Sequence, residues 1–94
     1  MTTPPETRHL RVTGRVQGVS YRAWTQATAR ALGLRGWVRN EADGSVRALL
    51  QGPPEAVAQM ITAMQDGPSG ARVDGVTDAP ATDPQIPEGF EVRR

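Results

Sequence analysis

The spacing of apolar residues changes from a period of two to a period near 3.6 and back again twice along the chain. Residues 9–13 alternate, with Leu10 and Val12 on one side and polar residues on the other, which is typical of a half-buried strand. Residues 21–32 are rich in good helix formers, and Gly33 follows where a glycine commonly ends a helix. The first third of the chain therefore predicts a strand followed by a helix.

The remainder of the chain indicates four further strands and a second helix. Residues 36–40 and 45–51 read as two strands, and the Asp-Gly pair between them is a common hairpin turn. Residues 53–64 begin with two prolines and then carry apolar residues at the i, i+3, i+4 and i+7 positions of a helix. A further strand is predicted over residues 72–79, and a short last one over residues 89–93.

The order strand, helix, strand, strand, helix, strand, with a short C-terminal strand, predicts an α+β protein of the ferredoxin-like class. In this two-layer sandwich an antiparallel-dominated sheet carries both helices on one face. The side chains expected in the shared core are Leu10, Val12, Val38, Trp24, Ala27, Ala31, Val57, Ile61 and Met64. Trp37 is also expected in the core, where it could border a bound substrate. The fold alone does not define a function, because enzymes, metal carriers and RNA-binding modules share it.

A chain of 94 residues has room for one small domain. We expect that domain to span residues 8–94, after a disordered tail at residues 1–7. The chain contains no cysteine, which excludes structural disulfides, thiolate metal sites and cysteine nucleophiles. No secretion signal or membrane-spanning segment is recognisable, so a cytoplasmic location is the default expectation. A net charge of +1 is too small to attract nucleic acid or an anionic membrane by its long-range field.

Positive charge is concentrated in the first half of the chain. Residues 1–50 hold eight arginines and three acidic residues, whereas residues 51–94 hold three arginines and seven acidic residues. A small anion would therefore be bound, if anywhere, by the first half. Uneven charge also arises by chance on solvated faces, so this observation does not decide the function.

The stretch from Val12 to Arg22 places a glycine-rich turn between the first strand and the first helix. Backbone N–H groups of such a turn and of the helix start can converge on an anion. Gly14 and Gly18 permit close approach of the backbone, and Arg22 can offer its planar N–H donors to a phosphate group. The same residues are also compatible with a tight turn and a solvated arginine, because the lysine and the spacing of the common phosphate-binding motifs are absent.

Two segments resemble the signatures of the acylphosphatase family. VTGRVQGVSYR at residues 12–22 is similar to the first signature, and GWVRNEADGSV at residues 36–46, followed by Gly52, is similar to the second. Both occur in the family's order and at its separation, and the similarity covers residues 8–94. Tyr21 departs from the pattern, in which Phe or Met is usual at this position. Tyrosine keeps the bulk of the side chain and adds a hydroxyl group.

The resemblance implies the ferredoxin-like fold and an enzyme that hydrolyses acyl phosphates to a carboxylate and inorganic phosphate, without a metal or other cofactor. The residues whose backbone amides would surround the phosphate are Gln17, Gly18, Val19 and Ser20. Arg22 would bind the phosphate, and Asn40 would orient the attacking water. A neutral amide can orient water but cannot take its proton, so the phosphate oxygens would have to accept it. We expect a monomer that binds small acyl phosphates and phosphate, but neither nucleic acid nor a membrane.

Other functions remain open from the residues alone. His9 is the single histidine, and its place in the first strand favours a partly exposed sheet residue over a phosphate relay. Glu41 and Asp43 lie near Asn40, but the turn explains the Asp-Gly pair, and Asn40 could itself stabilise that turn. RNA-recognition modules of the same element order stack bases on strand aromatics, which residues 45–51 lack. The more serious alternative is that the acylphosphatase fold serves here as an anion-binding or regulatory domain with little turnover, since similar domains occur inside larger carbamoyl-phosphate-processing proteins.

Overall fold

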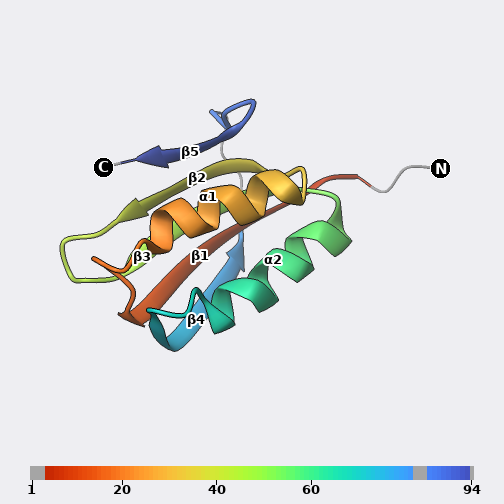
Figure 1. Ribbon diagram of the computed structural model, residues 1–94. Coiled ribbons are helices and arrows are strands. Elements are labelled where there is room, and N and C mark those ends of the chain that lie inside the picture. Colours follow the sequence, from red (N-terminus) through yellow and green to blue (C-terminus); the bar gives the residue numbers. More distant parts are fainter. Residues whose placement is uncertain (1–3, 82–84, 94) are drawn as a thin grey trace.

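The computed structural model describes residues 4–81 and 85–93. Within them the elements follow the predicted order (Figure 1). They are β1 (Glu6–Arg15), α1 (Tyr21–Ala31), β2 (Arg35–Asn40), β3 (Val46–Gly52), α2 (Pro54–Asp66), β4 (Arg72–Pro80) and β5 (Phe90–Arg93). Neither helix in this part of the chain is long and apolar enough to cross a membrane.

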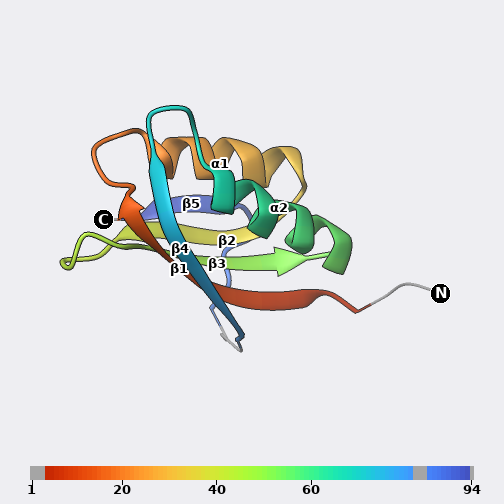
Figure 2. The same ribbon diagram turned by 90° about the horizontal axis from the view of Figure 1, so that it is seen from below.

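The strands form one sheet in the order β4-β1-β3-β2-β5. Neighbouring strands are antiparallel except β2 and β5, which are parallel. Both helices cover the same face of this sheet, as the two perpendicular views show (Figures 1 and 2). The predicted ferredoxin-like sandwich with a short C-terminal strand is therefore confirmed.

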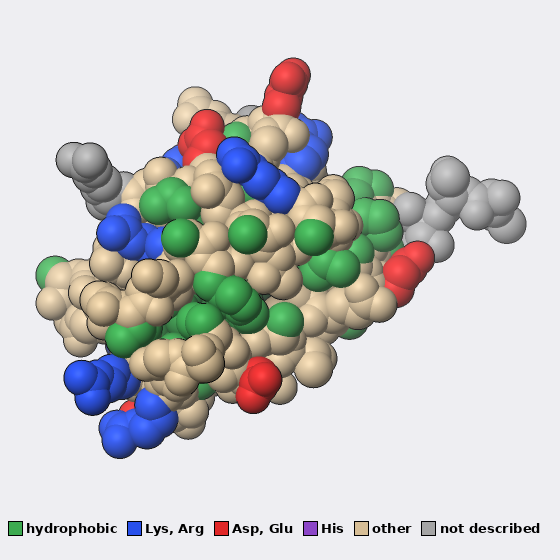
Figure 3. All heavy atoms as spheres, viewed as in Figure 1, with side chains coloured by type: hydrophobic (Ala, Val, Ile, Leu, Met, Phe, Trp, Pro, Cys, Tyr) green, Lys and Arg blue, Asp and Glu red, His purple; other side chains and the backbone are tan. Residues whose placement is uncertain are grey.

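The core lies between the helices and the sheet face that they cover. Leu10 and Val12 of β1 and Val38 of β2 are fully buried there, as predicted, because alternate side chains of a strand share one face. The residues that α2 buries are Val57, Met60 and Met64. Ile61, also expected in the core, is only half-buried against it. Figure 3 shows that apolar side chains occupy the middle of the helix-covered face, with the charged side chains mainly toward its periphery.

The first helix turns a different face inward from the one that we expected. Its buried residues are Tyr21, Thr25 and Ala29. Ala27 and Ala31 are exposed, and Trp24 is half-buried at the edge of the core. Thr25 can be buried because its hydroxyl donates to the Tyr21 carbonyl at 2.8 Å. The predicted face was wrong because it was drawn through apolar side chains only, which left Thr25 out.

Tyr21 joins the start of α1 to the end of α2. Its side chain is buried, and its hydroxyl donates to the carbonyl oxygen of Met64 at 2.7 Å. That carbonyl lies in the last turn of α2, where backbone acceptors have no partner within the helix. Burial raises the pKa of the Tyr21 hydroxyl well above its usual value. The hydroxyl that distinguishes Tyr21 from the family pattern therefore supplies a donor to a carbonyl group at the end of α2.

The boundary of the expected N-terminal tail needs correction. β1 begins at Glu6, and Glu6 and Thr7 pair with Gly52 and Gln51 of β3. These two residues therefore belong to the sheet, since the neighbouring strand is long enough to continue the hydrogen-bonded ladder past residue 8. Residues 1–3 of the expected tail lie outside the described part of the chain.

Trp37 is buried, but on the sheet face opposite to the helices. Its neighbours across the strands are Leu49 and then His9, and the His9 ring meets the indole edge-on with centroids 6.0 Å apart. The guanidinium groups of Arg39 and Arg93 lie 4.7 and 5.3 Å from the indole centroid. Trp37 is thus buried, as expected of a core aromatic, but it lies outside the main hydrophobic cluster, because the alternation of β2 gives the helix-covered face to Val38.

Candidate active site

The segment between β1 and α1 carries two residues in left-handed conformation. Gly18 has a φ of 73°, and Ser20 has a φ of 62°. Ser20 is the one non-glycine residue in the described part of the chain with a positive φ, a conformation that costs energy when a side chain is present. Left-handed residues turn successive backbone N–H groups toward a common side, and this creates a concave site for an anion.

The helix that follows begins without a side-chain cap. Ser20 is the N-cap residue, its hydroxyl makes no capping hydrogen bond, and no acidic residue lies in the first turn. The Ser20 carbonyl accepts the N–H of Trp24 at 3.0 Å, which is the first bond of the helix. The N–H groups of the first turn therefore have no partner within the helix, and together with the helix dipole they favour a bound anion.

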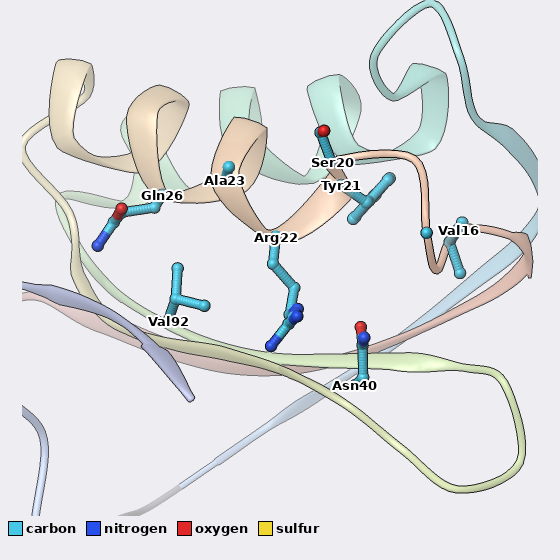
Figure 4. A pocket seen from close by; sticks show the side chains of 9 residues that line it. Val16, Ser20, Tyr21, Arg22, Ala23, Gln26, Asn40 and Val92 are labelled. Atoms are coloured by element: carbon cyan, nitrogen blue, oxygen red, sulfur yellow. The ribbon is translucent and has the colours of Figure 1, made fainter. Parts of the chain in front are cut away.

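A pocket of about 240 Å³ opens beside this helix start. The residues that line it are Val16, Gly18, Ser20, Tyr21, Arg22, Ala23, Gln26, Asn40 and Val92. Figure 4 shows the side chains of Arg22, from α1, and Asn40, from β2, reaching into the space between the helix and the sheet. The structure thus brings Gly18, Ser20, Arg22 and Asn40, four of the predicted site residues, to one cavity.

Of the described residues that line the pocket, Arg22 alone carries a charged side chain. Its Nη1 atom donates to the Arg93 carbonyl of β5 at 3.0 Å, which fixes the direction of the side chain. Among residues 4–81 and 85–93, no carboxylate forms an ion pair with Arg22. A guanidinium has five N–H donors, so most of them are available to an anion.

The acidic residues of the β2–β3 turn do not line the pocket. Glu41 forms an ion pair with Arg47 at 2.9 Å, and Asp43 forms one with Arg11 at 2.7 Å. Asp43 Oδ1 also accepts hydrogen bonds from the Ser45 hydroxyl at 2.6 Å and the Ser45 N–H at 2.9 Å. The Ser45 hydroxyl, followed by Arg11, holds the pKa of Asp43 well below its usual value. These carboxylates are therefore neutralised outside the pocket, which keeps its positive character.

Asn40 ends β2 with an unused hydrogen-bond acceptor. Its Oδ1 atom is buried and has no protein partner in the described part of the chain. Buried polar atoms nearly always have a partner, so an acceptor of this kind is suited to a water molecule or a ligand. The alternative role of stabilising the β2–β3 turn is filled by Asp43, through its two bonds from Ser45.

The two other predicted residues, Gln17 and Val19, do not line the pocket. Gln17 Nε2 donates to the carbonyls of Glu41 and Ser45, each at 2.8 Å, and so ties the loop to the β2–β3 turn. Val19 is half-buried against the core. The side chains of both residues therefore brace the loop, and only their backbone N–H groups remain candidates for binding.

Gln26 and Val92 line the pocket but were not predicted. Gln26 follows Arg22 by one helical turn, and this spacing places both side chains on one face of α1. That signal was present in the sequence. Val92 had none, because its place depends on the parallel pairing of β5 with β2.

The single histidine lies away from the pocket. His9 is on the opposite sheet face beside Trp37, where burial, followed by the charges of Arg47 and Arg39, lowers its pKa. In the described ranges no cluster of three or more His, Cys, Asp or Glu side chains could hold a metal ion. The polar groups that its described lining offers include an arginine, two side-chain amides, the Ser20 hydroxyl and backbone N–H groups.

Comparisons with known proteins identify the family to which the chain belongs. The family model for acylphosphatase matches residues 8–92. The chain belongs to the acylphosphatase family. It is 48% identical over 94 residues to an acylphosphatase of Rhizobium meliloti (strain 1021), covering 100% of this chain and 99% of the relative. It is 53% identical over 81 residues to an acylphosphatase of Rhodospirillum rubrum, covering 86% and 88% of the two chains.

A solved structure of an acylphosphatase from Coxiella burnetii matches with a TM-score of 0.90 and 29% identity, covering 96% of this chain and 94% of that one. The matches in sequence and in structure agree over nearly the whole chain. They confirm the family and the class of enzyme that the two signature segments indicated.

Proposed function

We propose that this protein hydrolyses the carboxyl–phosphate bond of small acyl phosphates, giving a carboxylate and inorganic phosphate. The observation that carries the proposal is the meeting of three features in one pocket. These are an uncapped helix start, the guanidinium of Arg22, which has no carboxylate partner in the described ranges, and the Asn40 Oδ1 atom, which has no hydrogen-bond partner there. Membership of the acylphosphatase family supports the same reaction.

Phosphate binds at the loop end of the pocket in this proposal. The groups that donate to its oxygens are the backbone N–H groups of Gln17, Gly18, Val19 and Ser20. Arg22 adds charge-assisted hydrogen bonds from the donors that it does not use for Arg93. Since all these donors are fixed before substrate arrives, they can stabilise the charge that spreads over the phosphoryl oxygens in the transition state.

Asn40 orients the attacking water through its Oδ1 acceptor. The water oxygen forms a bond to phosphorus while the bond from phosphorus to the acyl oxygen breaks. The carboxylate leaves with the bonding electron pair, and one proton of the water passes to a phosphate oxygen, because neither a carboxylate nor an imidazole is found among the described residues that line the pocket. The step uses neither a metal nor an organic cofactor. Positioning and charge stabilisation account for the rate, since a carboxylate is a good leaving group.

Release of phosphate from acetyl phosphate in the presence of EDTA tests this proposal, with p-nitrophenyl phosphate as the phosphomonoester for comparison. We expect turnover of acetyl phosphate that EDTA does not lower, and little turnover of the monoester. Arg22→Gln should abolish most of the activity. Arg30→Gln should retain it, because Arg30 lies in the last turn of the same helix. A protein that binds phosphate but does not turn over acetyl phosphate would instead be an anion-binding domain.

A further inference from the structure

Val92 is an exposed apolar side chain in the wall of the pocket. It is the one large hydrophobic residue in the described part of the chain that is exposed, at 39%. It lies in the edge strand β5 and pairs with Val38, whose side chain faces the helices. Because paired residues share a face, Val92 also points to the helix side, toward the pocket (Figure 4).

Two side chains of α1 hold β5 in place on either side of Val92. Gln26 Nε2 donates to the Phe90 carbonyl at 3.0 Å, and Arg22 Nη1 donates to the Arg93 carbonyl at 3.0 Å. The backbone of β5 is thus fixed both before and after Val92. The apolar side chain of Val92 is therefore carried by a backbone segment that is hydrogen-bonded to α1 at both ends.

Arg22 separates two ends of the pocket. Figure 4 shows its side chain between Asn40 on one side and Val92 and Gln26 on the other. Asn40 lies two residues beyond Val38, the β2 partner of Val92, which corresponds to about 7 Å along the strand. A phosphoryl group bound to Arg22 therefore has Asn40 toward one side and Val92 toward the other.

The reaction itself sets the direction of the acyl group. In phosphoryl transfer the attacking and leaving oxygens lie roughly in line, on opposite sides of phosphorus. With the water held by Asn40, the leaving carboxylate and its acyl group point toward Val92. Among the described residues, the side chains that line the pocket at that end are those of Ala23, Gln26 and Val92, and none of these three carries a charge.

We propose that Val92 packs against the acyl group of the substrate and determines specificity, so that acyl phosphates with an uncharged, apolar acyl group are preferred. This inference rests on the proposed function, because it takes Asn40 as the residue that holds the water. It adds the class of substrate and the residue that selects it. Contact with Val92 would strengthen as the acyl group grows from methyl to phenyl.

Kinetics with three substrates tests the proposal. The value of kcat/KM is measured for acetyl, benzoyl and succinyl phosphate with the unaltered protein, Val92→Thr and Val92→Lys. Threonine keeps the shape of valine but replaces a methyl group by a hydroxyl. It should lower kcat/KM for benzoyl phosphate roughly threefold to fivefold, and that for acetyl phosphate less than about twofold. Lysine should raise the ratio of succinyl to acetyl phosphate roughly twofold to fivefold, because it offers a cation to the acyl carboxylate.

Val76→Thr is the matched control, since Val76 lies in β4, the opposite edge strand of the sheet. It should leave both substrate ratios unchanged. Unchanged ratios in the two Val92 variants, with all three substrates hydrolysed, would overturn the inference and leave the proposed function standing. Failure of the unaltered protein to hydrolyse any of the three would overturn the proposed function, and this inference with it.

Nuclear magnetic resonance provides a second measurement that needs no variant. Methylphosphonate and benzylphosphonate carry the same anionic group, but only benzylphosphonate has an aromatic ring. Neither is hydrolysed, because carbon is bonded directly to phosphorus in both. Both should shift the amide signals of Gly18 and Ser20, whereas only benzylphosphonate should shift the methyl signals of Val92. An equal response of the Val92 methyl groups to the two compounds would show that the acyl end lies elsewhere.

Discussion

Replacing Tyr21 by phenylalanine would remove one hydroxyl group and leave a buried acceptor without its donor. The hydroxyl donates to the Met64 carbonyl at 2.7 Å, and the ring lies 5.4 Å from the ring of Trp24, centroid to centroid. Phenylalanine keeps the ring contacts and loses only the hydrogen bond. We therefore expect the free energy of unfolding at neutral pH to fall by about 1–2 kcal/mol. In a domain of this size, that corresponds to a Tm lower by roughly 5–15 °C.

The dependence on pH distinguishes this hydrogen bond from a general loss of packing. Burial raises the pKa of Tyr21 in the folded protein above its unfolded value of about 10. Above that pH the unfolded chain loses the phenolic proton while the folded chain keeps it. The unfolded state then binds fewer protons, so stability falls with rising pH, by up to about 1.4 kcal/mol per pH unit. The Tyr21→Phe variant has no such proton to lose.

The composition of the chain allows the titration of Tyr21 to be measured without overlap from other side chains. The sequence contains one tyrosine and no lysine or cysteine, so no other side chain is expected to titrate between about pH 9 and about pH 12. Urea unfolding of both proteins, from about pH 7 to about pH 11, gives the two stability curves. The difference between them should shrink above about pH 10. Equal stability at neutral pH, or an alkaline loss of the same size in the variant, would refute the role given to the hydroxyl.

Three further substitutions test the candidate site. Arg22→Ala should lower the rate with acetyl phosphate about 10²–10³-fold and weaken inhibition by phosphate; near-full activity with normal inhibition would place the anion elsewhere. Asn40→Ala should lose most of kcat yet bind phosphate almost normally, and a folded variant that hydrolyses at the parent rate would disprove the water-positioning role. Gln17→Ala should lower the free energy of unfolding by about 1–2 kcal/mol, measured in urea, because it releases the loop from two carbonyls; unchanged stability would argue against this brace.

Much of the fold was predictable because its elements leave local patterns in the sequence. The alternation at Leu10 and Val12 and the Asp-Gly turn each report a local backbone geometry, and the structure contains the corresponding strand and hairpin. The face of α1 was not predictable in the same way. Thr25 is buried because its hydroxyl has a partner in the preceding turn, and hydrophobicity alone does not register such a bond.

In the candidate site, too, the residues indicated by local patterns were predictable, and those that depend on contacts distant in the sequence were not. Gly18, Ser20 and Arg22 lie close together in the sequence, and Asn40 ends a predicted strand, so local patterns and family resemblance point to all four. The sequence does not show that the Gln17 side chain is used by the neighbouring turn. Nor does it show that β5 crosses to the far edge of the sheet and brings Val92 to the pocket, since that depends on strand order.

The position of β5 also changes how the role of Arg22 should be understood. β5 is a four-residue edge strand, and it pairs with β2 alone. Its ladder with β2 and the buried Phe90 side chain attach it to the sheet and core, and the bonds that Arg22 and Gln26 donate to its carbonyls attach it to α1. The guanidinium that we propose to bind the anion therefore also holds the strand that carries Val92. Removing Arg22 would disturb both ends of the pocket, whereas removing the Gln26 amide would loosen the Val92 end and leave the positive charge in place.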